Sequence, residues 1–73
     1  MKKKNAVISI IKEVINENKI DINSKSSQFI RWDSLAYVNI ALKLEKKFNV
    51  KIKASDMENM NSVKEIVKII NAI

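Results

Sequence analysis

The side chain best placed for chemistry in this sequence is the hydroxyl of Ser34, which follows Asp33 at the start of a strongly patterned segment. If that segment is a helix, Ser34 lies in its first turn, where unpaired backbone N–H groups and the helix dipole favour a negative group. A phosphate ester on Ser34 would be held there at the surface, within reach of a modifying enzyme. The residues alone favour a simpler alternative, in which Ser34 only assists Asp33 in capping the helix.

The other reactive or metal-binding side chains are better explained by structure. Glu13 and Glu17 are four residues apart and would repel each other on a helix surface, and no histidine is present to complete a metal site. We interpret Met57 and Met60 as core residues and Trp32 as an anchor for a loop. We therefore expect no metal site and no catalytic residues.

The chain contains no glycine, proline, cysteine or histidine, and these absences exclude several kinds of enzyme site. Without glycine there is no glycine-rich phosphate-binding loop, and without cysteine there is no thiol nucleophile or zinc–thiolate site. Without histidine there is no Ser–His–Asp triad. We expect that the protein is not itself an enzyme and that most of the machinery for its chemistry is elsewhere.

The length of 73 residues predicts a single domain, residues 1–73, with one small core. Hydrophobic residues make up 47% of the chain, which is ordinary for a folded protein. No apolar run approaches the roughly 20 residues that span a bilayer. The lysines at positions 2–4 are not followed by a signal-peptide cleavage site, so we expect a cytoplasmic protein. We also expect a monomer with no membrane partner.

The net charge of +6 raises the alternative of a small helical domain that binds nucleic acid or another partner through lysine. Half of the excess lies in residues 1–20, and Arg31 is the only cation that is not lysine. Proteins that read bases favour arginine for bidentate contacts, and the region around Ser34 is nearly neutral. We therefore do not expect nucleic acid as a partner.

Hydrophobic periodicity predicts a first helix over about residues 5–17, capped by Asn5 and ended by a left-handed Asn18. Residues 18–32 then form a long loop with several turn-forming side chains. The apolar residues of this loop indicate that it is pinned onto the core; they are Ile20, Ile22, Phe29, Ile30 and Trp32.

A central helix is predicted over residues 33–48, with Asp33 as its N-cap and Asn49 as a left-handed residue at its end. Its apolar residues cover more than half of the circumference, which is typical of a helix packed against several neighbours. The one broad polar face carries Asn39, Lys43, Lys46 and Lys47, with Ala36 at the near end.

The remainder of the chain predicts an extended connector over residues 50–52, a short helix over 55–60 capped by Ser55, and a last helix over 62–72. The sequence from Ser62 to Glu65 is a capping box for that last helix. The predicted fold class is all-α, a small bundle of three main helices and one short helix with a long first loop.

Four motifs of this sequence occur together in order: Trp-Asp-Ser-Leu at 32–35, Leu-Glu-Lys-Lys-Phe at 44–48, Val-Lys-Ile at 50–52, and Ser-Val at 62–63 before a final helix. With these motifs the sequence resembles the acyl carrier protein family along its whole length. The tryptophan before the motif is similar to freestanding carriers that work beside specialised pathways, such as those for polysaccharides or secondary metabolites.

The resemblance implies that a phosphopantetheinyl transferase uses coenzyme A and Mg²⁺ to attach 4′-phosphopantetheine covalently to Ser34. The thiol of that arm then carries an acyl or related group as a thioester to partner enzymes, which explains how a chain without cysteine can take part in thioester chemistry. Asp33 would help to position the metal ion of the transferase.

The resemblance also implies a surface for enzymes that load and use the acyl group, and we assign it to Leu35, Val38, Asn39, Lys43 and Lys46. By analogy and amphipathic placement, a cleft for the bound acyl chain would be lined by Val38, Leu42, Met57, Met60 and Ile66.

Two departures from the family pattern bear on this assignment. Arg31 stands where the family usually has glycine, three residues before the modified serine. The docking face carries lysines where family members are typically acidic, with Glu45 the main acid retained. We therefore expect dedicated partners with neutral or acidic docking sites.

Overall fold

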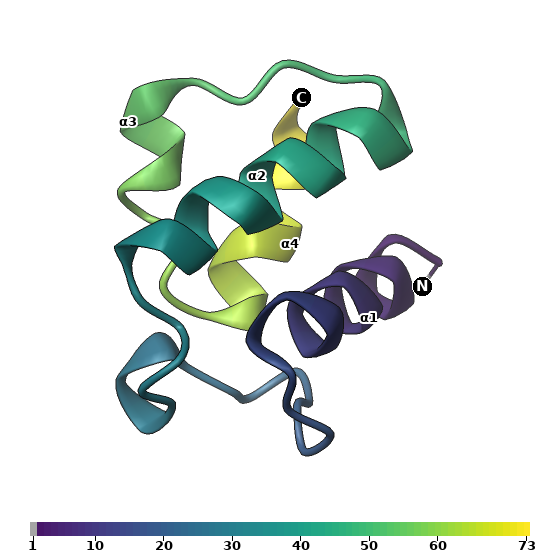
Figure 1. Cartoon of the computed structure of the whole chain (residues 1–73). Coiled ribbons are helices and arrows are strands. Elements are labelled where there is room, and N and C mark those ends of the chain that lie inside the picture. Colours follow the sequence, from purple (N-terminus) through teal and green to yellow (C-terminus); the bar gives the residue numbers. More distant parts are fainter. Residues whose placement is uncertain (1) are drawn as a thin grey trace.

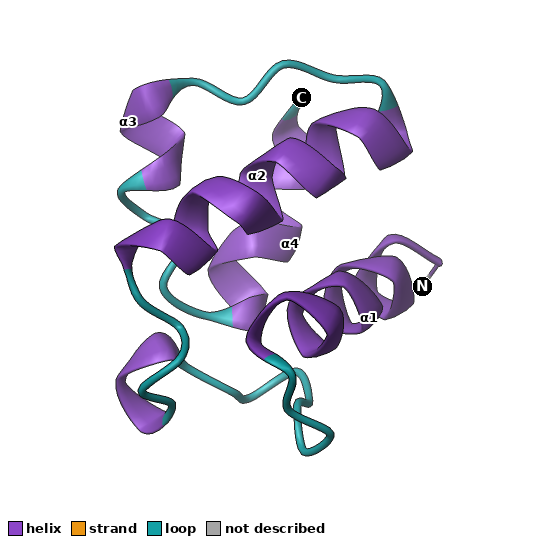
Figure 2. Cartoon of the chain, viewed as in Figure 1, coloured by secondary structure: helices purple, strands orange, loops and turns teal. Residues whose placement is uncertain are grey.

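The computed structural model describes residues 2–73, which form the predicted all-α bundle (Figures 1 and 2). The helices are α1 (Lys2–Ile15), α2 (Ser34–Phe48), α3 (Ala54–Met57) and α4 (Val63–Ala72), and a short 3-10 helix, η1 (Ser26–Gln28), lies in the long first loop. In Figure 1, α1 and α2 run in opposite directions. Helix α1 packs against both α2 and α4, and α3 packs against α2.

A left-handed asparagine follows each of the helices α1 and α2. The one after α2 is at the predicted position, and the one after α1 is not. Asn49 has the left-handed φ of 55° expected after α2, but the left-handed residue after α1 is Asn16, with φ 54°, and not Asn18. In each case the next N–H donates to the carbonyl five residues earlier, Glu17 to Lys12 and Val50 to Glu45, both at 3.1 Å. Asparagine takes this conformation here because it tolerates it best among non-glycine residues.

Helix α1 begins at Lys2, earlier than the predicted residue 5, so Asn5 lies inside the helix and does not cap it. The short helix α3 is also displaced from its predicted range of 55–60. It begins at Ala54 with Lys53 as an N-cap that makes no side-chain hydrogen bond, so Ser55 is not the cap. After Met57 the chain turns, and this turn places Met60 in the core with no exposed surface.

Ser62 caps helix α4 as predicted, because its Oγ accepts a hydrogen bond from the N–H of Glu65 at 3.1 Å. The predicted capping box is only half formed, since the structure gives no return bond from the Glu65 carboxylate to the N–H of Ser62. The extended connector before α3 is also confirmed, since residues 50–53 belong to no helix or strand. Among residues 2–73 no helix is long and apolar enough to cross a bilayer.

The long first loop is pinned to the core, as the sequence predicts. The carbonyl of Ser24 accepts from the N–H of Val63 at 3.0 Å, and the N–H of Ser26 donates to the carbonyl of Asn61 at 2.7 Å. Two residues of the loop, Ile20 and Trp32, are buried in the core. Ile30 is the exception, because its side chain is 97% exposed.

The core joins all the long helices, and its largest fully enclosed side chains are Val7, Ile11, Ile15, Ile40, Leu44, Met60, Val63, Ile66 and Ile70. On α2, Ala36 belongs to this core and not to the polar face where we expected it, and it lines a hollow together with Val14 of α1. In contrast, Leu35, Val38 and Leu42 remain 67%, 43% and 55% exposed, so the apolar arc of α2 is not wholly buried.

Candidate functional site

Ser34 is the first residue of α2, and its side chain is exposed. The preceding residue, Asp33, is extended at φ −103° and ψ −169° and is the N-cap. Its carboxylate accepts from the N–H of Ala36 at 3.0 Å, and its carbonyl accepts from the N–H of Tyr37 at 3.0 Å. The first N–H groups of a helix have no intrahelical acceptor, so Ser34 stands at the positive end of α2 with its hydroxyl in solvent.

The loop before Ser34 is fixed at both ends. Trp32 is 3% exposed, and its backbone N–H donates to the carbonyl of Phe29 at 3.1 Å. Further back, the hydroxyls of Ser26 and Tyr37 lie 3.1 Å apart in a hydrogen bond that joins the loop to α2. These contacts support the interpretation of Trp32 as an anchor, and they give Ser34 a defined position.

The residues expected to form a docking surface lie together on one exposed side of α2. Leu35, Val38 and Leu42 form an apolar stripe of helical spacing, and the exposed side chains of Asn39, Lys43 and Lys46 border it. Leu42 was assigned to the acyl cleft from the sequence, but it belongs to this stripe by exposure. The fully exposed Ile30, four residues before Ser34, is a further surface apolar residue that the sequence reading had placed on the core.

Glu45 is not an exposed acid of this face, although from the sequence we counted it as the main acid retained there. Its side chain is half-buried, and its Oε2 accepts from the backbone N–H of Ile52 at 2.7 Å. Glu45 therefore holds the connector after α2 against the end of that helix. With Glu45 engaged in this way, lysines dominate the charge on the far half of the exposed face.

The five residues expected to line an acyl cleft are divided between the core and the surface. Met60 and Ile66 have no exposed surface, Met57 is half-buried, and Val38 and Leu42 face solvent. They therefore form no open cleft in this structure.

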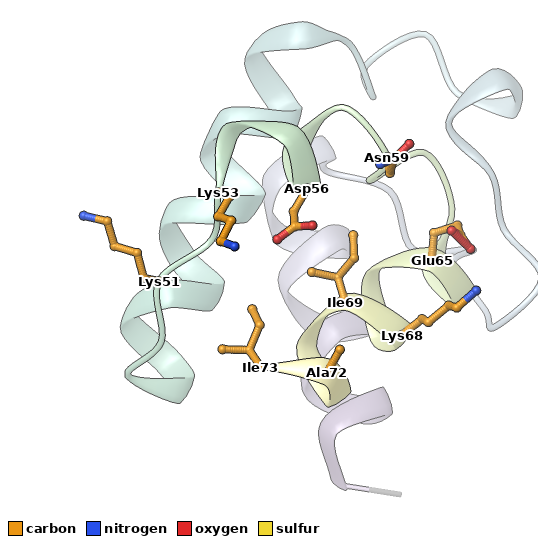
Figure 3. Close-up of a pocket in the computed structure, with 9 residues that line it drawn as sticks. All are labelled: Lys51, Lys53, Asp56, Asn59, Glu65, Lys68, Ile69, Ala72 and Ile73. Carbon is orange, nitrogen blue, oxygen red and sulfur yellow. The ribbon is translucent and has the colours of Figure 1, made fainter.

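An open cavity of about 480 Å³ lies elsewhere, between the connector, α3 and α4 (Figure 3). Figure 3 shows Lys53 and Asp56 on one side and Ile69 and Ile73 on the other, all directed into this space. Its lining includes Lys51, Lys68 and Glu65 but neither Asp33 nor Ser34. Among residues 2–73, no three acidic side chains gather in a way that could hold a metal ion.

Comparisons with known proteins agree with this geometry. The family model described as the phosphopantetheine attachment site matches residues 5–70. The solution structure of the holo acyl carrier protein from Geobacter metallireducens superposes with a TM-score of 0.81 and 18% sequence identity, covering 99% of this chain and 85% of that one. At this identity the structural match bears on the fold, which is that of an acyl carrier protein.

Proposed function

Because the chain belongs to the acyl carrier protein family, in which 4′-phosphopantetheine is attached covalently, we propose that Ser34 is the residue that carries this arm. The protein is a carrier and not an enzyme. When attached, the arm supplies a terminal thiol that can hold an acyl or related group as a thioester. The observation that carries the assignment is the place of Ser34, exposed at the start of α2 and next to an aspartate cap.

The surroundings of Ser34 fit a phosphate ester. The helix dipole and the backbone N–H groups of the first turn favour a negative group at this point. The side chains of Asp33, Ser34 and Leu35 are all exposed, so no part of the fold has to move before an enzyme can reach the hydroxyl. The hydrogen bonds that anchor the loop restrict the start of α2, which lowers the entropic cost of recognition by a transferase.

Asp33 has two roles in this proposal. Its carboxylate caps α2 through Ala36, and the same exposed carboxylate helps to position the Mg²⁺ ion that a phosphopantetheinyl transferase brings with coenzyme A. Coenzyme A dependence leads us to expect that loading occurs in the cytoplasm.

The exposed stripe on α2 is the proposed surface for the transferase and for the enzymes that load and use the acyl group. Leu35 and Val38 lie next to the arm, and Asn39, Lys43 and Lys46 follow on the same side. Because lysine dominates this side, we expect dedicated partners with neutral or acidic docking sites, in a specialised biosynthetic pathway. The protein would meet them as a monomer.

A cargo cleft remains part of the proposal, but the structure requires it to form by opening the core. Met60 and Ile66 are enclosed, so an acyl chain could contact them only if the core beside Met57 opened. Loading a medium-length acyl group should then change the chemical shifts of Met57, Met60 and Ile66. Shift changes confined to other residues would argue against this cleft.

The assignment of Ser34 is tested by incubating the protein with a promiscuous phosphopantetheinyl transferase, coenzyme A and Mg²⁺ and then measuring the intact mass. Wild type should gain one phosphopantetheine group, and Ser34→Ala should gain none. Ser55→Ala is the matched control, because Ser55 is also exposed and also lies in the first turn of a helix. A gain that persists in Ser34→Ala would defeat the assignment.

A further inference from the structure

Three adjoining hollows follow the seam between α1 and α2. The first, of about 240 Å³, lies beside Asp33 and Leu35 and shares Val14 and Asn39 with the second, of about 520 Å³. The second shares Glu13 and Lys43 with the third, of about 260 Å³. Because neighbouring hollows share residues from both helices, the three lie end to end along the seam, and together we call them the α1–α2 groove.

The α1–α2 groove begins beside the residue that precedes Ser34 and runs to the other end of α2. Its first hollow contains Asp33 and its third contains Lys47. At 1.5 Å per residue, this stretch of α2 is about 21 Å long. A helix of about 14 residues has the same length and could lie along the seam of two antiparallel helices.

The groove combines apolar surface with positive charge. Leu35 and Leu42 are more than half exposed, and the half-buried Ile10 and Val14 of α1 contribute apolar surface from the other wall. Its cations are Arg31, Lys43, Lys46 and Lys47, against the acids Glu13 and Asp33.

The groove keeps an excess of positive charge, because it has four cations and only two carboxylates. Glu13 lies 3.4 Å from the Nζ of Lys43, but the two side chains are 67% and 48% exposed. A pair this exposed contributes little stability, so Lys43 can exchange Glu13 for another carboxylate. Lys46 and Lys47, in the last turn of α2, make no ion pair within residues 2–73.

We propose that the α1–α2 groove is the docking site for an acidic amphipathic helix of a partner enzyme. This inference rests on the proposed carrier function, because the groove leads to Ser34 and would bring the partner to the arm. The apolar face of such a helix would cover Leu35 and Leu42, and its carboxylates would meet the lysines at 43, 46 and 47. A second copy of this chain fits poorly, since two grooves of the same charge would repel each other.

The test uses two 14-residue helical peptides with the same leucine stripe, one flanked by glutamate and the other by lysine. Each is titrated into isotopically labelled full-length protein, and the amide shifts are followed by NMR. The glutamate peptide should bind, shift Val14, Leu42 and Lys43, and lose affinity as salt is raised. The lysine peptide should not bind.

Charge reversal with a matched control tests whether the groove is responsible. Lys43→Glu/Lys46→Glu/Lys47→Glu should weaken binding of the glutamate peptide by about tenfold or more and allow binding of the lysine peptide. Lys51→Glu/Lys53→Glu/Lys68→Glu changes the net charge equally in the cavity of Figure 3, and should lose far less affinity. Circular dichroism melts establish that both variants fold.

Several outcomes would overturn the proposal. These are equal binding of both peptides, equal weakening by the two triple variants, or shifts confined to the Figure 3 cavity. Tighter binding of the same face to generic duplex DNA, or self-association through it, would also refute it. The intact-mass assay on wild type is independent of these results. If the wild type gains phosphopantetheine but does not bind the glutamate peptide, only the proposed role of the groove is refuted. If the wild type gains no mass, the carrier assignment is refuted.

Discussion

The carboxylate of Asp33 accepts a hydrogen bond from the backbone N–H of Ala36 at 3.0 Å, and this bond spans Leu35 and the proposed attachment residue, Ser34. This bond closes the first turn of α2 around Ser34 while leaving the serine side chain exposed. The same bond fixes Ala36, which is buried in the core. The side chain of Asp33 therefore caps α2 directly beside the proposed attachment residue and holds a core residue in the first turn.

Substitutions at Asp33 should separate its structural role from its role in loading. Asp33→Ala should lower the free energy of unfolding by about 1 kcal/mol, because an N-cap is lost. Asp33→Asn keeps an N-cap oxygen and should change stability by only a few tenths of a kcal/mol. We expect both variants to be loaded more slowly. Urea denaturation measures the change in stability, and the initial rate of mass gain measures loading. Normal loading of Asp33→Asn would contradict a role for Asp33 in positioning the metal ion.

Glu45 should matter for stability and not for loading. Its Oε2 accepts from the N–H of Ile52 at 2.7 Å, so Glu45→Ala leaves a partly buried donor without its acceptor and should cost about 1–2 kcal/mol in urea denaturation. Glu45→Gln keeps an acceptor and should cost less. Glu58→Ala, at an exposed acid just after α3, is the control and should be near neutral. Equal stability of Glu45→Ala and Glu58→Ala would contradict this role.

The left-handed backbone at Asn49 predicts opposite effects for two small residues. Asn49→Ala should lower the free energy of unfolding by about 1 kcal/mol, because a Cβ penalises this conformation, whereas Asn49→Gly should be neutral or stabilising. Asn39→Ala, at an exposed helical position of α2, should cause no loss. Thermal denaturation of the three variants provides the comparison, and a stable Asn49→Ala would show that the helix end adopts another conformation in solution.

Arg31 occupies a position where related carriers usually have glycine, yet its backbone does not need one. Among residues 2–73 the only positive φ values belong to Asn16 and Asn49. Arg31→Gly should therefore destabilise the protein by about 0.5–1 kcal/mol through greater freedom of the unfolded chain, and it should be loaded at the same rate as Arg31→Ala. Arg31→Ala controls for the lost charge. A stabilised Arg31→Gly would reveal backbone strain in this loop.

Patterns that depend on local chemistry predicted the fold well. Asp33, Ser62 and Asn49 were identified as helix ends because each satisfies a backbone requirement that sequence neighbours fully define. The prediction of Asn18 as the left-handed end of the first helix was wrong, because Asn16 also allows this conformation and the helix stops directly after Ile15, its last buried residue.

Burial on α2 could not be predicted from its pattern alone. Ala36 looked peripheral beside the polar residues, but it is buried in the core. The helical pattern alone counted Leu35, Val38 and Leu42 in the apolar arc of α2, whereas the family resemblance assigned Leu35 and Val38 to a docking surface. All three are exposed. Ile30 was misplaced because periodicity says nothing about which side of a loop meets the core.

The charge of the site also became clear only in three dimensions. The sequence comparison counted Glu45 as an acid of the docking face, but that carboxylate bonds to the connector at Ile52. Spacing along the chain could not show that Glu13 of α1 lies beside Lys43 of α2. Both facts follow from contacts between separate elements.

The most direct test of the proposed function is to locate the added group on the wild-type chain after treatment with transferase, coenzyme A and Mg²⁺. Trypsin cleaves after Arg31 and Lys43 and releases residues 32–43, in which Ser34 is the only serine. We predict that this peptide alone carries the phosphopantetheine mass and that fragmentation places it on Ser34. Residues 26–31 contain the loop serines Ser26 and Ser27, and residues 54–64 contain Ser55 and Ser62, which lie at helix starts. Modification of either of these peptides would contradict the assignment.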